Sequence, residues 1–104
     1  MFHWFVKVPN ISTNELKSRL NQEVVLLDVR TPAEYRSGQI RGAKNVPLNR
    51  ISQYETKGKQ THYVICQSGM RSKQAAKILA KKGIQVVNDK GGMNAWTDRV
   101  IGGK

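Results

Sequence analysis

Cys66 is the residue of this chain whose type and surroundings best suit covalent chemistry. It is the only cysteine, and it follows the run His62–Ile65, which we expect to form a buried strand. A short loop then leads to an alanine-rich segment that we expect to be a helix. Backbone N–H groups of such a loop, a helix N-terminus and the Arg71 guanidinium would together lower the pKa of the thiol. We therefore predict a reactive thiolate and sulfur chemistry at Cys66, although the common alternative for a free cysteine is a small buried apolar residue.

The residues after Cys66 are the candidate binding groups. We expect their amides to face the sulfur and to bind a substrate or a sulfur-loaded cysteine: Gln67, Ser68, Gly69, Met70, Arg71 and Ser72. The fork of donors on Arg71 can face either the loop carbonyls or an incoming anion.

Asp28 and Arg30 follow another apolar run and are the candidate supporting residues. In a parallel sheet, side chains at the carboxyl ends of strands meet at one edge, which is where ligands of such sheets bind. Asp28 can orient the loop or Arg30, or it can simply cap the neighbouring turn. Arg30 can steer an anionic substrate or pair with Glu34, four residues further along.

Three motifs in order resemble those of rhodaneses, the sulfurtransferase family. They are Cys-x-x-Gly-x-Arg-Ser at 66–72, the long segment at 27–47, and Gly-Gly-Met-Asn-Ala-Trp at 91–96, so the resemblance covers about residues 10–98. It departs at Gln39, where many relatives carry a histidine, and we interpret this as a surface change that leaves the chemistry untouched. The resemblance implies one rhodanese domain over residues 1–104, with a central, mostly parallel five-stranded sheet and helices on both faces.

The alternation of expected elements agrees with an α/β domain. We expect a first strand over 1–8 and a frayed tail from Ile101 to Lys104. Between them we expect helices or helical segments over 12–20, 31–38, 48–54, 72–82 and 92–98, and strands over 24–27, 45–46, 62–65 and 84–87.

The resemblance also implies a mechanism. The Cys66 thiolate would take a sulfane sulfur from thiosulfate or a similar small anionic donor, and the resulting persulfide would pass it to cyanide, a thiol or a protein acceptor. No metal or organic cofactor is required. A single cysteine cannot form an intramolecular disulfide, and a free thiol suits a reducing compartment, so we expect a cytoplasmic protein without a membrane span.

The sequence also bears on other functions that a reactive cysteine could serve. A phosphatase of the same fold would have a loop one residue longer than the four residues between Cys66 and Arg71. A non-catalytic interaction module would be expected to lack the cysteine. A Cys–His hydrolase is disfavoured because His62 lies a strand length from Cys66. A persulfide carrier that feeds an acidic partner protein, with little thiosulfate activity, stays open.

The charge of the chain is strongly positive, at +11. Lys73, Lys77 and Lys81 recur every four residues and should share one face of the expected helix. Such a face is usually only solvated, but it can also dock an acidic protein or RNA. No aromatic residues are interleaved with these lysines, so we expect no specific binding of nucleic acid.

Overall fold

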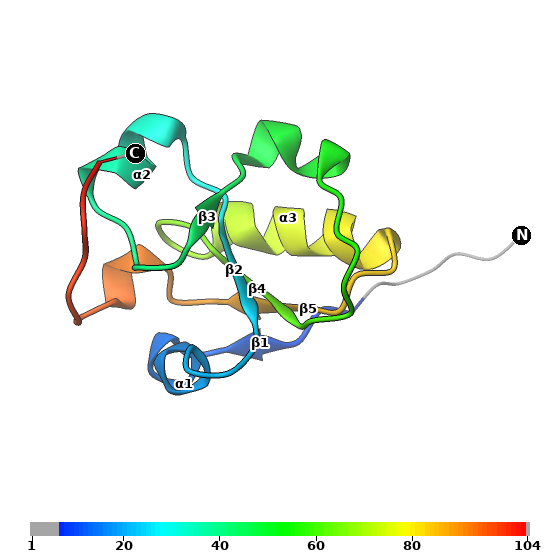
Figure 1. Cartoon of the computed structure of the whole chain (residues 1–104), viewed down its shortest axis with the longest axis horizontal. Coiled ribbons are helices and arrows are strands. Elements are labelled where there is room, and N and C mark those ends of the chain that lie inside the picture. Colours follow the sequence, from blue (N-terminus) through cyan, green and yellow to red (C-terminus); the bar gives the residue numbers. More distant parts are fainter. Residues whose placement is uncertain (1–6, 104) are drawn as a thin grey trace, which may run out of the picture.

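The computed structural model describes residues 7–103, and a five-stranded parallel sheet forms its centre (Figure 1). The strand order is β1-β5-β4-β2-β3. The strands are β1 (Asn10–Ile11), β2 (Val25–Asp28), β3 (Lys44–Asn45), β4 (His62–Ile65) and β5 (Val86–Asp89). The helices are α1 (Thr13–Arg19), α2 (Pro32–Ser37) and α3 (Met70–Lys81), with 3-10 helices at Leu48–Gln53 and Met93–Ala95.

Helices cover both faces of this sheet, as expected from the sequence. Figure 1 shows α3 on one side of the sheet and α1 on the other. One apolar core joins Leu27 and Val64 to Ala76 and Leu79 of α3. The other core joins residues of β2 and β4 to Leu16 of α1 and Tyr35 of α2. β2, β4 and β5 supply both cores, because successive side chains of a strand point to opposite faces. The expected α/β fold is confirmed.

The register places the candidate site at one edge of the sheet. β4 is the central strand, and Ile65, its last residue, pairs with Asp28 of β2. On the other side of β4, Val64 pairs with Asn88 of β5. Cys66 therefore leaves the sheet between the ends of two strands that both terminate in an aspartate, Asp28 and Asp89.

The helices on the two faces begin with different caps. The Ser12 side chain accepts from the Glu15 N–H at the start of α1. Thr31 and Glu34 form a complete capping box at the start of α2, with a proline in the first turn. α3 instead has Gly69 as its N-cap residue, with a φ of +96°, a left-handed conformation that glycine adopts without strain. The helix thus starts at Met70, two residues earlier than expected.

The second half of the chain departs from the expected strand and helix limits. The expected strand over 84–87 is displaced to Val86–Asp89, because Gly83 and Ile84 donate to carbonyls of α3 and close that helix in a Schellman motif. The expected helix over 92–98 is only the 3-10 turn Met93–Ala95. Its first amides, those of Met93 and Asn94, donate to the carbonyls of Cys66 and Gln67 rather than starting a helix.

Both ends of the chain also differ from expectation. The strand expected over 1–8 lies mostly outside the described residues, and Lys7 and Val8 belong to no strand. The tail expected to be frayed is tied down as far as Gly103, since Ile101 pairs with Gln39 in an antiparallel bridge. Gln39 itself is not on the surface: its side chain is buried and donates to the carbonyls of Tyr35 and Gly103.

Candidate active site

Cys66 lies at the base of the loop between β4 and α3 and has no exposed surface. The Gly69 N–H donates to its Sγ over 3.0 Å. The Ser72 Oγ, in the first turn of α3, lies 3.4 Å from the same sulfur. The loop and the helix start thus point hydrogen-bonding groups at one buried thiol.

These groups alter the pKa of the thiol. Burial alone raises the pKa of Cys66, but the Ser72 hydroxyl and the backbone N–H groups of Ser72, Gly69 and Ser68 lower it by a larger amount. The pKa of Cys66 is therefore lower than its ordinary value. Donors aimed at a sulfur favour its anionic form, which is the form that acts as a nucleophile.

Two glycines allow the loop to pack closely against the segment after β5. At Gly69, a Cβ atom would collide with the Lys90 carbonyl. At Gly92, where φ is +66°, a Cβ atom would collide with the carbonyls of Gln67 and Cys66. Only glycine permits this approach. The motif at 91–96 thus packs directly against the backbone of the reactive loop.

Arg71 forms an ion pair with Glu34 of α2. The two guanidinium nitrogens donate to the two carboxylate oxygens at 2.7 and 2.9 Å. This pairing lowers the pKa of Glu34 from 4.5 to about 2. Arg71 is therefore held by Glu34 rather than by the loop carbonyls, and its side chain stays about a third exposed. It links the start of α3 to the start of α2.

Arg30 forms a second ion pair, with Asp28 rather than with Glu34. Its guanidinium donates to both Asp28 carboxylate oxygens, the shortest contact being 2.8 Å, and both side chains are buried. The expected alternative of an Arg30–Glu34 pair is wrong, because Glu34 is engaged by Arg71. Arg30 also donates to the Gln67 Oε1 at 3.3 Å. Asp28 thus orients Arg30, and Arg30 contacts the reactive loop.

Gln67 extends this chain of contacts across the loop. While its Oε1 accepts from Arg30, its Nε2 donates to the Asn94 Oδ1 over 2.7 Å. The other candidate loop residues differ in exposure: Ser72 is buried, Ser68 is exposed, and the Met70 side chain is among the exposed large apolar groups at 71%. The structure therefore brings all the predicted site residues to one edge of the sheet, but with distinct surroundings.

Asp89 is a site residue that the sequence did not indicate. It is fully buried, and its Oδ1 accepts from the Gly91 and Gly92 amides and from the Thr13 hydroxyl. It therefore fixes the glycine segment that supports the loop. The only signal in the sequence was an aspartate shortly before a pair of glycines, which is typical of a turn.

Other residues of interest lie away from the Cys66 sulfur or in the core. His62 lies at the amino end of β4, where it contacts Tyr54, so it is separated from Cys66 by the length of the strand. Trp96 and Met93 are partly buried and pack against the core that contains Leu16 and Tyr35. Within residues 7–103, no helix is long and apolar enough to cross a membrane, and no group of three or more His, Cys, Asp or Glu side chains is placed to hold a metal ion.

Comparison with known proteins identifies the family. The profile of the Rhodanese-like domain matches residues 12–99, which include the loop and all three motifs. This chain belongs to the rhodanese-like family. The Bacillus subtilis protein YtwF is 39% identical over 95 residues, an alignment that covers 88% of this chain and 92% of that protein.

Further relatives agree with this assignment. A sulfurtransferase of Allochromatium vinosum is 36% identical over 94 residues, which covers 86% of this chain and 88% of the relative. The crystal structure of a rhodanese-like domain protein from Staphylococcus aureus superposes with a TM-score of 0.80 at 37% identity, covering 88% of this chain and 93% of that one. Two longer Bacillus subtilis relatives also match, and this rhodanese spans 62% and 52% of their lengths.

Proposed function

We propose that this rhodanese transfers a sulfane sulfur from thiosulfate or a similar anionic donor to a thiophilic acceptor through a persulfide on Cys66. The observation that carries this proposal is the buried Cys66 thiol, whose sulfur accepts from the Gly69 N–H and lies 3.4 Å from the Ser72 Oγ. Membership of a family that includes sulfurtransferases supports the same conclusion. We also propose a cytoplasmic location, because a free thiol suits a reducing compartment.

In the first step, the Cys66 thiolate attacks the outer sulfur of thiosulfate. A new S–S bond forms at Cys66, the S–S bond of thiosulfate breaks, and its electron pair leaves with sulfite. In the second step, cyanide or a thiolate attacks the terminal sulfur of the persulfide. The electron pair of that S–S bond returns to Cys66 as the thiolate, and thiocyanate or an acceptor persulfide leaves.

The loop residues have distinct roles in this proposal. The terminal persulfide sulfur carries a negative charge, and the amides from Gln67 to Ser72 stabilise it. Of these, the amides of Ser68, Gly69 and Ser72 already bond to the Cys66 sulfur. Arg71 and Arg30 act as positioning residues, because each is held by a carboxylate. Since Cys66 has no exposed surface, the loop must yield slightly to admit the outer sulfur of the donor.

Steady-state kinetics test this function. Thiocyanate formation from thiosulfate and cyanide should follow parallel-line, ping-pong kinetics, and Cys66→Ser should abolish it. Ser68→Ala is the matched control, because the Ser68 hydroxyl is exposed and only its amide acts on the sulfur. Intersecting lines, or turnover by Cys66→Ser, would contradict the persulfide mechanism. Phosphatase activity abolished by Cys66→Ser, without sulfur transfer, would assign the site to phosphoryl chemistry.

A further inference from the structure

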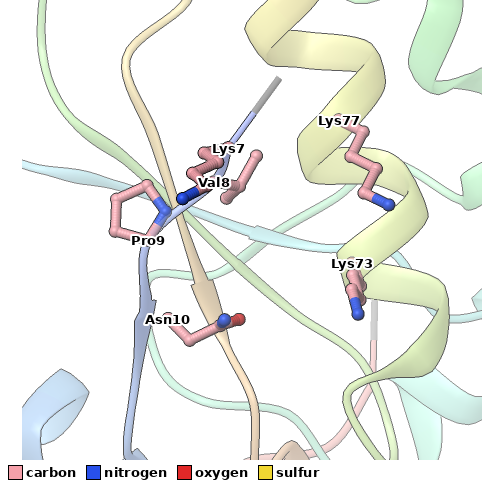
Figure 2. Close-up of a pocket in the computed structure, with 6 residues that line it drawn as sticks. All are labelled: Lys7, Val8, Pro9, Asn10, Lys73 and Lys77. Carbon is pink, nitrogen blue, oxygen red and sulfur yellow. The ribbon is translucent and has the colours of Figure 1, made fainter. Parts of the chain in front are cut away.

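A lysine-lined groove runs from the reactive loop along one side of α3. Two adjoining hollows, each of about 490 Å³, form it and share Asn10, Lys73 and Lys77. The first hollow is bounded by the segment from Lys7 to Asn10, and Figure 2 shows this segment facing Lys73 and Lys77 of α3. The second hollow reaches the loop and is also lined by Ser68, Gly69, Met70, Gln74, Asn88 and Lys90. We call the two together the lysine groove.

The positive charge of the lysine groove is not balanced within the described part of the chain. All seven acidic residues lie among residues 7–103. Five of them pair with other cations: Glu15 with Arg19, Asp28 with Arg30, Glu34 with Arg71, Glu55 with Lys82 and Asp98 with Lys17. Among residues 7–103, no carboxylate lies within 4.0 Å of the four groove lysines, which are Lys7, Lys73, Lys77 and Lys90. Their positive potential is thus available to a partner.

We propose that the lysine groove docks an acidic segment of a partner protein whose thiol exchanges sulfur with Cys66. The proposal rests on the proposed function and adds the chemistry of the partner. Carboxylates complement the four lysines. The stems of these lysines, together with Val8 and Pro9, offer apolar contact to the rest of such a segment.

The lysine groove adjoins the loop that carries Cys66, so a docked segment would lie close to the reacting sulfur. Its second hollow ends at Ser68, Gly69 and Met70, which belong to the loop that surrounds the Cys66 sulfur. A segment bound along α3 therefore brings its next residues to the loop. The exposed Met70 side chain lies at that end and can adapt to the apolar surface of a partner.

A protein segment fits the lysine groove better than RNA does. Single-stranded RNA is bound by aromatic side chains that stack on its bases, and the described residues that line the groove include none. A tethered thiol is also an acceptor for the persulfide, whereas RNA without a thiol is not. Binding of RNA is therefore an outcome that would count against the proposal.

The test compares two synthetic peptides that each contain one cysteine, followed by a run either of glutamates or of glutamines. Cys66 is first loaded with thiosulfate, and the rate of sulfur transfer to each peptide is measured at low salt. The glutamate peptide should react with at least about a tenfold higher kcat/KM, an advantage that added salt removes. Lys73→Glu/Lys77→Glu should abolish this advantage.

Lys57→Glu/Lys59→Glu is the matched control, because it changes the net charge equally in the exposed turn before β4, at the opposite end of that strand from the loop. This control should keep most of the preference for the glutamate peptide. Equal losses in both variants, no preference in the parent protein, or tighter binding of polyuridine than of the glutamate peptide would overturn the proposal. Transfer to dithiothreitol, a small neutral thiol, should be the same in all three proteins. Failure of this transfer in the parent protein would instead refute the proposed function.

Discussion

The two sides of the reactive loop use positive charge in opposite ways. On one side, Arg30 and Arg71 are each held by a carboxylate, Asp28 and Glu34 respectively. On the other side, the lysines of the groove have no carboxylate within 4.0 Å among residues 7–103. Paired charges fix positions, whereas unpaired charges keep their potential for a ligand. The paired side thus holds the loop, and the proposed partner binds the unpaired side.

The two ion pairs on the paired side differ in how deeply they are buried. The Arg30 and Asp28 side chains are 4% and 0% exposed, whereas those of Arg71 and Glu34 are about a third exposed. A buried pair is costly to break because the remaining charge has no solvent, whereas an exposed pair contributes little. The comparison therefore predicts a descending series of effects across the site.

The largest effect on stability is expected from Arg30→Met. This substitution leaves the Asp28 carboxylate buried without its cation, so the free energy of unfolding should fall by about 3–5 kcal/mol, as measured by urea denaturation. Asp28→Asn/Arg30→Met is the control and should recover part of the loss, because no charge remains buried. A loss below about 1 kcal/mol in the single variant would show that this pair does not hold the loop.

Ser72→Ala tests whether the loop, rather than either charged side, sets the reactivity of the thiol. Removing the hydroxyl that stabilises the thiolate should raise the pKa of Cys66, and the pH profile of its alkylation rate should move to higher pH. Ser68→Ala should leave the profile unchanged, because its amide remains. A profile that moves with Lys73→Gln but not with Ser72→Ala would assign the control of the thiol to the groove.

Glu34→Gln should have a smaller effect on stability, of about 1 kcal/mol, because the pair with Arg71 is partly solvated. The pKa of Glu34 is lowered from 4.5 to about 2, so its stabilising effect is complete above pH 4.5 and is lost as the pH falls toward 2. Acid titration of the unfolding free energy should be flatter in the variant across this interval. Identical acid titrations would contradict the pairing.

Lys73→Glu/Lys77→Glu should have the smallest effect on stability, within about 0.5 kcal/mol, because both side chains are exposed and unpaired with any acid among the described residues. Thermal unfolding of this variant, compared with that of Lys57→Glu/Lys59→Glu, measures the change in stability. A loss of several kcal/mol would mean that the groove lysines hold the fold rather than a partner.

Local patterns explain why much of the fold followed from the sequence. Thr31, Pro32 and Glu34 predicted the start of α2, and the apolar runs before Asp28 and Cys66 predicted neighbouring buried strands. The final helix and the frayed tail were wrong because these segments bond to distant parts of the chain. The amides of Met93 and Asn94 are occupied by the loop carbonyls, and local propensity cannot reveal that.

The same limit applies to the site. The positions of the loop residues followed from their motif, but the partner of Arg71 did not, because Glu34 lies 37 residues away and meets it only through the packing of two helices. The sequence likewise offered Glu34 as a partner for Arg30, since the two residues are four apart, although the buried Asp28 holds Arg30 instead. Asp89 was missed because it pairs with Ile11 of β1 and accepts from Thr13, which lies 76 residues away in the sequence.

The central claim is that Cys66 carries the transferred sulfur, and intact mass spectrometry tests it most directly. The reduced protein should gain the mass of one sulfur atom on incubation with thiosulfate and lose it on addition of cyanide, while Cys66→Ser should show neither change. A gain of sulfur by Cys66→Ser, or no gain by the parent protein at any thiosulfate concentration, would contradict thiosulfate-driven loading of Cys66.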